Sequence, residues 1–259
     1  MQDFNCFLST FYRNILDSFD IYCRRGDDDM DLISGSLLVG SIYATYELVN
    51  KLDVGEIVAS RFKKVDSNCL TIGYKRRLGM KIPIVIDQKK TPHCMIVGLS
   101  GSGKSKMVEG ALKEKKNCVV LNAFPEDMQT LNCRRIFGEE RIFKFLSNLL
   151  ENKQYYEDGL FIVVDEALVL VNTSKRICKL LQDILSIGRH YHWWLVLLSQ
   201  AGTKNDIPFK NLFNCRVCLK NVDPSSYSVV LGAPVDVKLQ PREFVVYHTD
   251  IEHGRTYDV

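Results

Sequence analysis

Residues 94–105 read Cys-Met-Ile-Val-Gly-Leu-Ser-Gly-Ser-Gly-Lys-Ser. The apolar start predicts a buried strand, the glycines predict a tight loop, and residues 105–115 (SKMVEGALKEK) predict a helix. The loop fits the pattern G-x-x-x-x-G-K-[ST] of a phosphate-binding loop (P-loop). Glycines let backbone N–H groups turn inward around phosphate oxygens, and a helix N-terminus adds positive partial charge. The alternative is a glycine-rich turn with an incidental lysine.

The P-loop predicts a nucleotide site with defined roles. Lys104 is expected to reach the β- and γ-phosphates, and the Ser105 hydroxyl is expected to ligate Mg²⁺. ATP and Mg²⁺ are therefore the predicted ligands. The residues expected to line the nucleotide are Gly98, Leu99, Ser100, Gly101, Ser102, Gly103, Lys104 and Ser105.

A second apolar run, residues 160–164 (LFIVV), ends in Asp165 and Glu166. We expect this strand to lie beside the P-loop strand and to carry both acids to the carboxyl edge of the sheet, where ligands bind in open α/β sheets. Asp165 is suited to hold Mg²⁺ and Glu166 to polarise the attacking water, which predicts hydrolysis as well as binding. A strand followed by Asp-Glu is also common as an ordinary strand end.

A third apolar run, residues 193–198, ends in Ser199 and Gln200. Gln200 is expected to contact the γ-phosphate or the lytic water, and the alternative is a strand-terminal glutamine that faces solvent. Arg189 precedes this strand and fits the role of a cation at a helix C-terminus. His190 and His192 are expected to be surface or packing residues rather than metal ligands.

The alternation of apolar strands and helices after residue 93 predicts an α/β fold with a mainly parallel sheet covered by helices on both faces. We expect helices near residues 139–152 and 173–189, and further strands at CVVLN, NCRVCLK and EFVVYH. The expected organisation is an N-terminal helical region at 1–53, a small β-rich lead-in at 54–90, and the ATPase domain at 91–259. Basic clusters in the lead-in are expected to be solvated strand ends, with contact to a phosphate backbone as the alternative.

The N-terminal region has two apolar segments. Residues 4–19 predict a helix with one apolar face, expected to pack within the protein or against another subunit; a membrane surface is the alternative. Residues 32–49 include an apolar run of about 15 residues, short of the roughly 20 that span a membrane, so a buried helix is favoured over a weak anchor. With no secretory signal, the predicted location is the cytoplasm, with membrane association through this region as the alternative.

Composition narrows the class of protein. The chain has 259 residues, 46% hydrophobic and 25% charged, with a net charge of +3, which excludes a wholly disordered or fibrous chain and does not by itself indicate nucleic acid. Nine cysteines, an odd number, favour reduced thiols. The one close pair, Cys215 and Cys218, is expected on a strand with its sulfurs on opposite faces, which argues against a metal or redox site.

Several motifs resemble the FtsK/SpoIIIE family. The stretch from Leu78-Gly79 to Asp87 resembles the family's short hairpin, and Pro92-His93 directly before the P-loop strand is its distinguishing feature. VVDE at 163–166, Gly188-Arg189, and Ser199-Gln200 resemble later family motifs. So do Ile207-Pro208, the segment 214–220, and the segment 223–232. The resemblance spans about residues 72–250.

The resemblance implies a RecA-like ATPase that assembles as a ring, usually a hexamer, and moves double-stranded DNA through its centre. ATP lies between subunits in such rings, so an arginine of a neighbour can stabilise the transferring phosphoryl group. Arg216 is the first candidate for this role in trans and Arg189 the second.

Departures from the family pattern predict a stripped motor. The sequence lacks the family's N-terminal membrane spans and DNA-reading winged-helix domain, and Ala201 stands where a proline is usual. These features are typical of plasmid, conjugative-element or viral versions, so DNA transfer, replication or packaging is the expected task, with a relaxase or replication initiator as loading partner. Two alternatives remain: an ATPase that moves protein, and a nucleotide-binding adaptor without turnover.

Overall fold

A computed structural model describes residues 66–77, 80–122, 127–203, 206–221 and 225–257. The chain divides into two units, residues 1–64 and 65–259, and the described residues all belong to the second. The helices expected at 4–19 and 32–49 lie outside the described residues, as does the first part of the β-rich lead-in, residues 54–65. In the described part of the chain, no helix has both the length and the apolar character needed to cross a membrane.

The described residues build one ten-stranded sheet in the order β2-β1-β10-β9-β8-β3-β7-β6-β4-β5. Neighbours from β8 to β5 are parallel, and the pairs from β8 towards β2 are antiparallel. The strands are β1 (Cys69–Arg77), β2 (Met80–Asp87), β3 (Cys94–Val97), β4 (Cys118–Leu121), β5 (Arg134–Ile136), β6 (Leu160–Val164), β7 (Trp193–Ser199), β8 (Cys215–Leu219), β9 (Glu243–Tyr247) and β10 (Ile251–Arg255).

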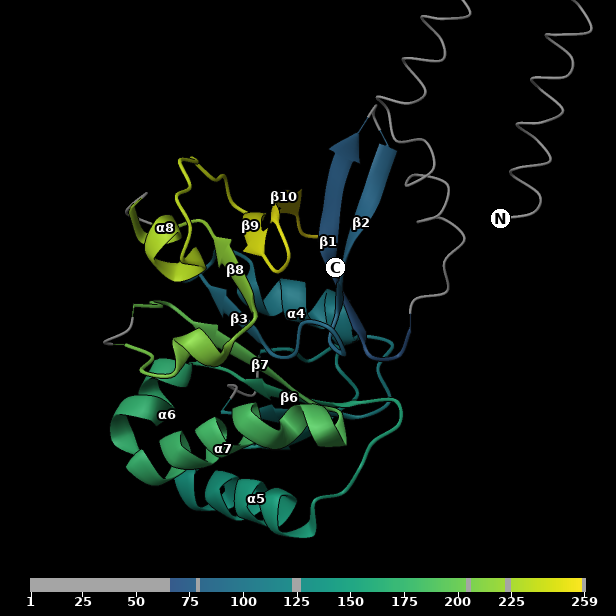
Figure 1. The fold of residues 1–259 in the computed structure, drawn as a ribbon, viewed down its shortest axis with the longest axis vertical. Coiled ribbons are helices and arrows are strands. Elements are labelled where there is room, and N and C mark those ends of the chain that lie inside the picture. Colours follow the sequence, from purple (N-terminus) through teal and green to yellow (C-terminus); the bar gives the residue numbers. More distant parts are fainter. Residues whose placement is uncertain (1–65, 78–79, 123–126, 204–205, 222–224, 258–259) are drawn as a thin grey trace, which may run out of the picture. The chain divides into compact units, whose positions relative to one another are not determined.

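Helices cover both faces of this sheet. The helices are α4 (Lys104–Leu112), α5 (Glu139–Asn152), α6 (Ala167–Thr173), α7 (Lys175–Tyr191) and α8 (Ser225–Leu231), with a short 3₁₀ helix, η1 (Lys210–Leu212). Side chains of α5, α6 and α7 join one hydrophobic cluster, and Figure 1 shows these three helices together on one side of the strands. Side chains of α4 and of the β1–β2 hairpin join the cluster on the other face. The predicted α/β architecture is confirmed.

Sequence periodicity explains the central elements. Every residue of β3, β4, β6 and β7 is buried, as expected for strands covered on both faces. Helix α7 begins after Ser174, whose hydroxyl accepts a hydrogen bond from the backbone N–H of Ile177 at 3.4 Å. Its buried residues recur at helical spacing, so one face of the helix packs on the sheet.

One expectation about strand order is wrong. The strand that ends before Asp165, β6, does not lie beside the P-loop strand β3, because β7 pairs with both of them. The apolar runs of these strands are alike, so local sequence does not determine which one is central. The consequence is functional, because the end of β7, with Gln200, lies between the P-loop and the two acids.

The structure also contains elements that the sequence pattern did not predict, namely β5, α6, α8 and β10. Each has seven residues or fewer, and the side chains of β10 are exposed or half-buried, so an apolar repeat is weak or missing. The two cysteines of β8 behave as expected. Cys215 joins one hydrophobic cluster and Cys218 the other, so their sulfurs lie on opposite faces of the sheet.

Candidate active site

The P-loop connects β3 to α4 and is held by its neighbours on both sides. The Gly98 N–H donates to the Ser199 carbonyl at the end of β7, and the Leu99 N–H donates to the Lys220 carbonyl after β8, both at 3.1 Å. Gly101 and Gly103 have φ values of +73° and +107°, which side chains other than glycine rarely adopt. These two glycines therefore allow the loop to curl ahead of the helix N-terminus.

Lys104, the first residue of α4, folds back onto the loop. Its ammonium donates to the carbonyls of Gly98 at 2.8 Å and Leu99 at 3.0 Å. Burial lowers the pKa of Lys104, and the nearby carboxylates of Glu166 and Asp165 oppose this shift. A partly buried ammonium held by neutral carbonyls favours an anionic oxygen as a ligand, which fits a phosphate.

Asp165 and Glu166 follow β6 at the carboxyl edge of the sheet. Asp165 is buried, and one of its carboxylate oxygens accepts the backbone N–H of Glu166 at 3.0 Å. Burial raises the pKa of Asp165 to about 6, with smaller contributions from Glu166 and Asp127. A buried carboxylate among other carboxylates is a favourable position for a cation.

Gln200 and Glu166 are in direct contact. The Gln200 side-chain amide donates to both carboxylate oxygens of Glu166, at 3.2 and 3.3 Å. Glu166 has a φ of 45°, in the left-handed region, at the start of α6. This contact orients the Glu166 carboxylate, which is suited to act as a base, toward Gln200. Gln200 follows β7, the strand that pairs with the P-loop strand β3.

A Mg²⁺ ion fits the donors present. Ser105 on α4 supplies a hydroxyl and Asp165 supplies a carboxylate, which are oxygen ligands of the kind that Mg²⁺ takes. Within the described ranges, no group of three or more His, Cys, Asp or Glu side chains could hold a metal by itself. Mg²⁺ is usually bound through one or two protein oxygens together with substrate phosphates, and Ser105 and Asp165 would supply such oxygens.

The sequence reasoning missed Asn122, at the end of β4. Its side-chain amide donates to the Asp165 carbonyl at 3.3 Å, and its backbone N–H donates to the Ile136 carbonyl at 3.0 Å. Asn122 therefore helps to hold the main chain that carries the acids. A polar residue directly after an apolar strand was the available signal, because parallel strands end at the same edge.

The two arginines proposed to act in trans differ in their surroundings. The Arg216 guanidinium donates to the carbonyls of Phe213 and Leu231, both at 3.1 Å. It therefore holds the C-terminal end of α8 against β8. Arg189 is exposed in the last turn of α7, just before β7 begins, whereas Gln200 follows the end of that strand. Within one subunit, Arg189 and Gln200 thus lie at opposite edges of the sheet.

His93, of the Pro-His pair, has a structural position. Its Nδ1 accepts the Leu195 N–H and its Nε2 lies against the Leu185 carbonyl, both at 3.1 Å, so the neutral ring carries its hydrogen on Nε2. Burial lowers the pKa of His93 to about 4. A Cβ added to Gly188 would lie 2.9 Å from the Trp193 carbonyl oxygen and 3.1 Å from His93 Cε1. His93 of the Pro-His pair and Gly188 of the Gly-Arg pair therefore both lie where α7 packs against the strands.

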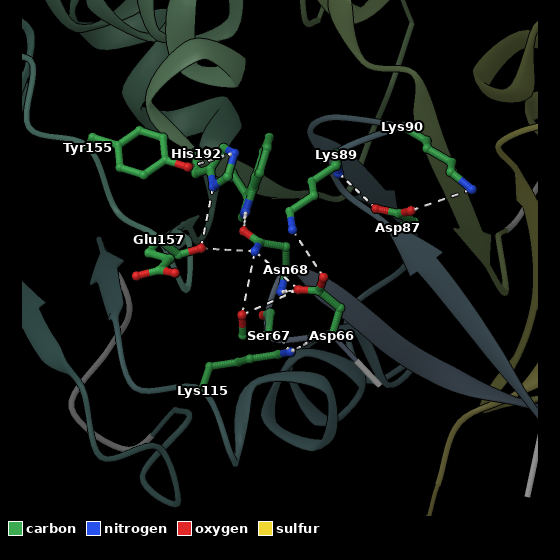
Figure 2. A network of polar contacts seen from close by, with 11 residues as sticks. Asp66, Ser67, Asn68, Asp87, Lys89, Lys90, Lys115, Tyr155, Glu157 and His192 are labelled. Atoms are coloured by element: carbon green, nitrogen blue, oxygen red, sulfur yellow. Dashed lines mark hydrogen bonds and ion pairs between the residues drawn. The ribbon is translucent and has the colours of Figure 1, made fainter. Parts of the chain in front are cut away.

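The basic clusters near the hairpin are largely ion-paired. Lys75 contacts Glu252 at 2.9 Å, Lys89 contacts Asp66 at 3.0 Å, and Lys90 contacts Asp87 at 3.8 Å. Figure 2 shows Lys89 directed toward Asp66 and Lys90 toward Asp87. The expectation of solvated strand ends therefore suits these lysines better than a phosphate-binding surface, while residues 61–64 lie outside the described part.

The described residues have the RecA-like fold of P-loop proteins, with a P-loop and two acids at the carboxyl edge of the sheet. Residues 54–112, from the lead-in to the end of α4, match the model of the FtsK/SpoIIIE family. The resemblance predicted from the Pro-His pair and the P-loop is therefore confirmed. No curated protein sequence matches the chain.

Solved structures support the same fold. The conjugation coupling protein TcpA of pCW3, in a monomer form with ATPγS, is 16% identical over 76% of this chain and 68% of that chain, with a TM-score of 0.61. The cytoplasmic domain of the type VII secretion ATPase EccC of Thermomonospora curvata is 20% identical over 78% of this chain and 30% of that one, with a TM-score of 0.63. The cytoplasmic domain of EssC is 15% identical over 90% and 55%, with a TM-score of 0.62. At these identities the similarity establishes the fold alone.

Proposed function

We propose that the chain is a Mg²⁺- and ATP-dependent motor that moves double-stranded DNA as a homo-oligomeric ring, with a hexamer as the expected form. The observation that carries the proposal is the convergence of Lys104, Asp165, Glu166 and Gln200 at one edge of the sheet. This set provides a phosphate-binding cation, a metal-binding acid, a base and an amide that contacts the base. Adaptors that only bind nucleotide do not need the last two groups.

Each side chain has a defined part in hydrolysis. Lys104 exchanges its two loop carbonyls for oxygens of the β- and γ-phosphates. Ser105 and Asp165 would hold Mg²⁺, which when bound would supply positive charge near the phosphate oxygens. Glu166 accepts hydrogen bonds from the attacking water and orients it toward the γ-phosphorus. Gln200, which donates to Glu166, is positioned to respond when the γ-phosphate departs.

An arginine of the neighbouring subunit completes the site in this proposal. Arg189 suits that role better than Arg216, because the Arg216 guanidinium already serves two carbonyls of its own chain. An exposed guanidinium is available to a neighbour's nucleotide. A mixing experiment tests this role. Arg189→Ala subunits keep Lys104, and Lys104→Ala subunits keep Arg189, so a mixed ring contains some interfaces with both groups intact. Each variant alone should be inactive, and the mixture should regain part of the ATP hydrolysis rate.

Support for DNA as the cargo comes from the family resemblance and from the fold shared with a conjugation coupling protein. The test is the ATPase rate of the full chain with and without a duplex of several tens of base pairs. Duplex should stimulate hydrolysis, and the stimulation should fall steeply between roughly 50 and 200 mM salt, because phosphate contacts release counterions. Absence of stimulation by any nucleic acid would remove DNA from the proposal while leaving the ATPase intact.

The second candidate function is transport of protein, which the fold similarity to the type VII secretion ATPase EccC favours. It needs the same nucleotide chemistry and no DNA. An ATPase rate that is indifferent to duplex but rises with a protein cargo would support it. A loading partner such as a relaxase or replication initiator belongs only to the DNA proposal, and co-purification of a relaxase with the full chain would favour that proposal.

A further inference from the structure

A tight turn before β9 carries an arginine in an unusual conformation. The Glu243 N–H donates to the Gln240 carbonyl at 3.1 Å, so residues 240–243 form a β-turn with Pro241 and Arg242 at its centre. Arg242 has a φ of 71°. A proline followed by a residue with positive φ indicates a type II turn, whose third position normally favours glycine or asparagine. An arginine there breaks the local rule, which natural proteins do mainly at functional sites.

This turn lies directly against the P-loop. The Arg242 N–H donates to the Ser102 carbonyl at 3.2 Å. A Cβ built on Gly103 would lie 3.7 Å from Arg242 Cγ, so the arginine stem runs alongside the loop. On its other side, the Arg242 carbonyl accepts the Thr256 N–H at 2.9 Å, and Nη2 donates to the Tyr257 carbonyl at 3.1 Å. Arg242 thus connects the phosphate-binding loop to the segment after β10.

Ser102 and Thr256, which share main-chain hydrogen bonds with Arg242, have a second feature in common. The hydroxyls of Ser102 and Thr256 are both buried and make no hydrogen bond with any described residue. Buried polar groups are nearly always hydrogen-bonded, so the orphaned hydroxyls on both sides of Arg242 show that the described residues do not fully satisfy the polar groups around it.

Strand order shows which part of a nucleotide this region would meet. The acids follow β6 and Gln200 follows β7, which lie on one side of the P-loop strand β3. Arg242 precedes β9, which lies on the other side of β3, beyond β8. A nucleotide with its γ-phosphate toward Glu166 and Gln200 and its nucleoside on the opposite side of β3 would approach Arg242.

We propose that Arg242 is a nucleotide-binding residue that acts within its own subunit. Its guanidinium leaves the Tyr257 carbonyl and contacts the nucleoside half of the bound nucleotide, between the α-phosphate and the base. This inference rests on the proposed function, because it assumes that the P-loop binds a nucleotide. It adds a contact outside the P-loop and the acids, and it gives a reason for an arginine at a position that suits glycine.

The experiment compares Arg242→Gly and Arg242→Lys with the unaltered full chain. Glycine keeps the backbone N–H that contacts Ser102 and suits a φ of 71°, so it removes the side chain while preserving the turn. Lys153→Gly is the matched control, because Lys153 also has positive φ (49°) and a cationic side chain but follows α5, at the opposite edge of the sheet. Dissociation constants are measured for Mg-ATP by calorimetry and for inorganic tripolyphosphate by competition against a fluorescent ATP analogue.

Arg242→Gly should weaken Mg-ATP binding about tenfold or more, the loss expected for one charge-assisted hydrogen bond, and leave tripolyphosphate affinity unchanged. Arg242→Lys should lose less, and Lys153→Gly should bind both ligands normally. Unchanged ATP affinity in Arg242→Gly overturns the inference. Equal weakening of ATP and tripolyphosphate also overturns it, since the effect would then come from the P-loop itself. If the unaltered chain binds no nucleotide, the proposed function itself fails. If the unaltered chain binds Mg-ATP and Arg242→Gly binds it equally well, only the inference about Arg242 fails.

Discussion

The buried imidazole of His93 should make the stability of the unit formed by residues 65–259 depend on pH, and one substitution should isolate that effect. The ring is 1% exposed, with Nδ1 accepting the Leu195 N–H and Nε2–H donating to the Leu185 carbonyl. Protonation of Nδ1 would place a charge on a desolvated ring. It would also replace the acceptor of the Leu195 N–H by a second N–H, so that hydrogen bond would be lost. His93→Asn removes the titrating group, while asparagine tolerates the φ of 63° and offers an amide oxygen to Leu195.

The magnitude follows from the two pKa values. The pKa of His93 is about 4 when folded and about 6.5 when unfolded. Between these values the unfolded chain binds a proton that the folded chain does not, so stability falls as the pH falls. The contribution of His93 should therefore drop by about 2 kcal/mol from pH 7 to pH 5. His93→Asn should cost about 1–3 kcal/mol at pH 7, because the Leu185 carbonyl loses its donor.

The assay is urea unfolding of the full chain at pH 7 and pH 5, followed by tryptophan fluorescence. Both tryptophans of the chain, Trp193 and Trp194, are fully buried in β7, so the fluorescence reports unfolding of the unit formed by residues 65–259. Asp165 shifts stability in the opposite direction, because its pKa is raised to about 6 when folded and protonation then favours the folded state. Asp165 is present in both proteins, so its effect cancels in the difference between them.

The advantage of the unaltered chain over His93→Asn should shrink from pH 7 to pH 5 by most of that 2 kcal/mol. His190→Asn, at an exposed position of α7, controls for the loss of a histidine outside the core. A gap between the unaltered chain and His93→Asn that is the same at both pH values would refute the reasoning, because the ring would then not remain neutral on folding.

Three further substitutions test the site and its supports. Glu166→Gln should lower the ATP hydrolysis rate by roughly 10²–10⁴-fold while Mg-ATP still binds in calorimetry, and an unchanged rate would favour an adaptor without turnover. Gly188→Ala should lower the free energy of unfolding of the unit formed by residues 65–259 by about 1–3 kcal/mol in urea, because the added methyl would lie 2.9 Å from the Trp193 carbonyl oxygen. An unchanged free energy of unfolding would show that α7 moves away freely. Arg216→Ala should lower the free energy of unfolding by about 1–3 kcal/mol, since two carbonyls lose their donor. Loss of hydrolysis at full stability would instead indicate a catalytic role in trans.

Much of the fold was predictable from local sequence. The P-loop, the runs 160–164 and 193–199 and the helix 139–152 were recognised because burial on both faces requires continuous apolar strands, and an amphipathic helix requires a 3.6-residue repeat. Short elements were not predictable because seven or fewer residues carry too little periodicity, and because the side chains of β10 are exposed or half-buried and mostly polar.

The sequence by itself determined which chemistry is available: a lysine after glycines, two acids after a strand and a glutamine after another. Tertiary structure decided which of these groups meet. Strand order puts β7 between β3 and β6, so Gln200 contacts Glu166, and it puts the turn with Arg242 beside Ser102, 140 residues earlier in the chain. Local sequence cannot encode such contacts, because a parallel strand is buried on both faces wherever it lies in the sheet, and only packing of the whole chain selects its neighbours.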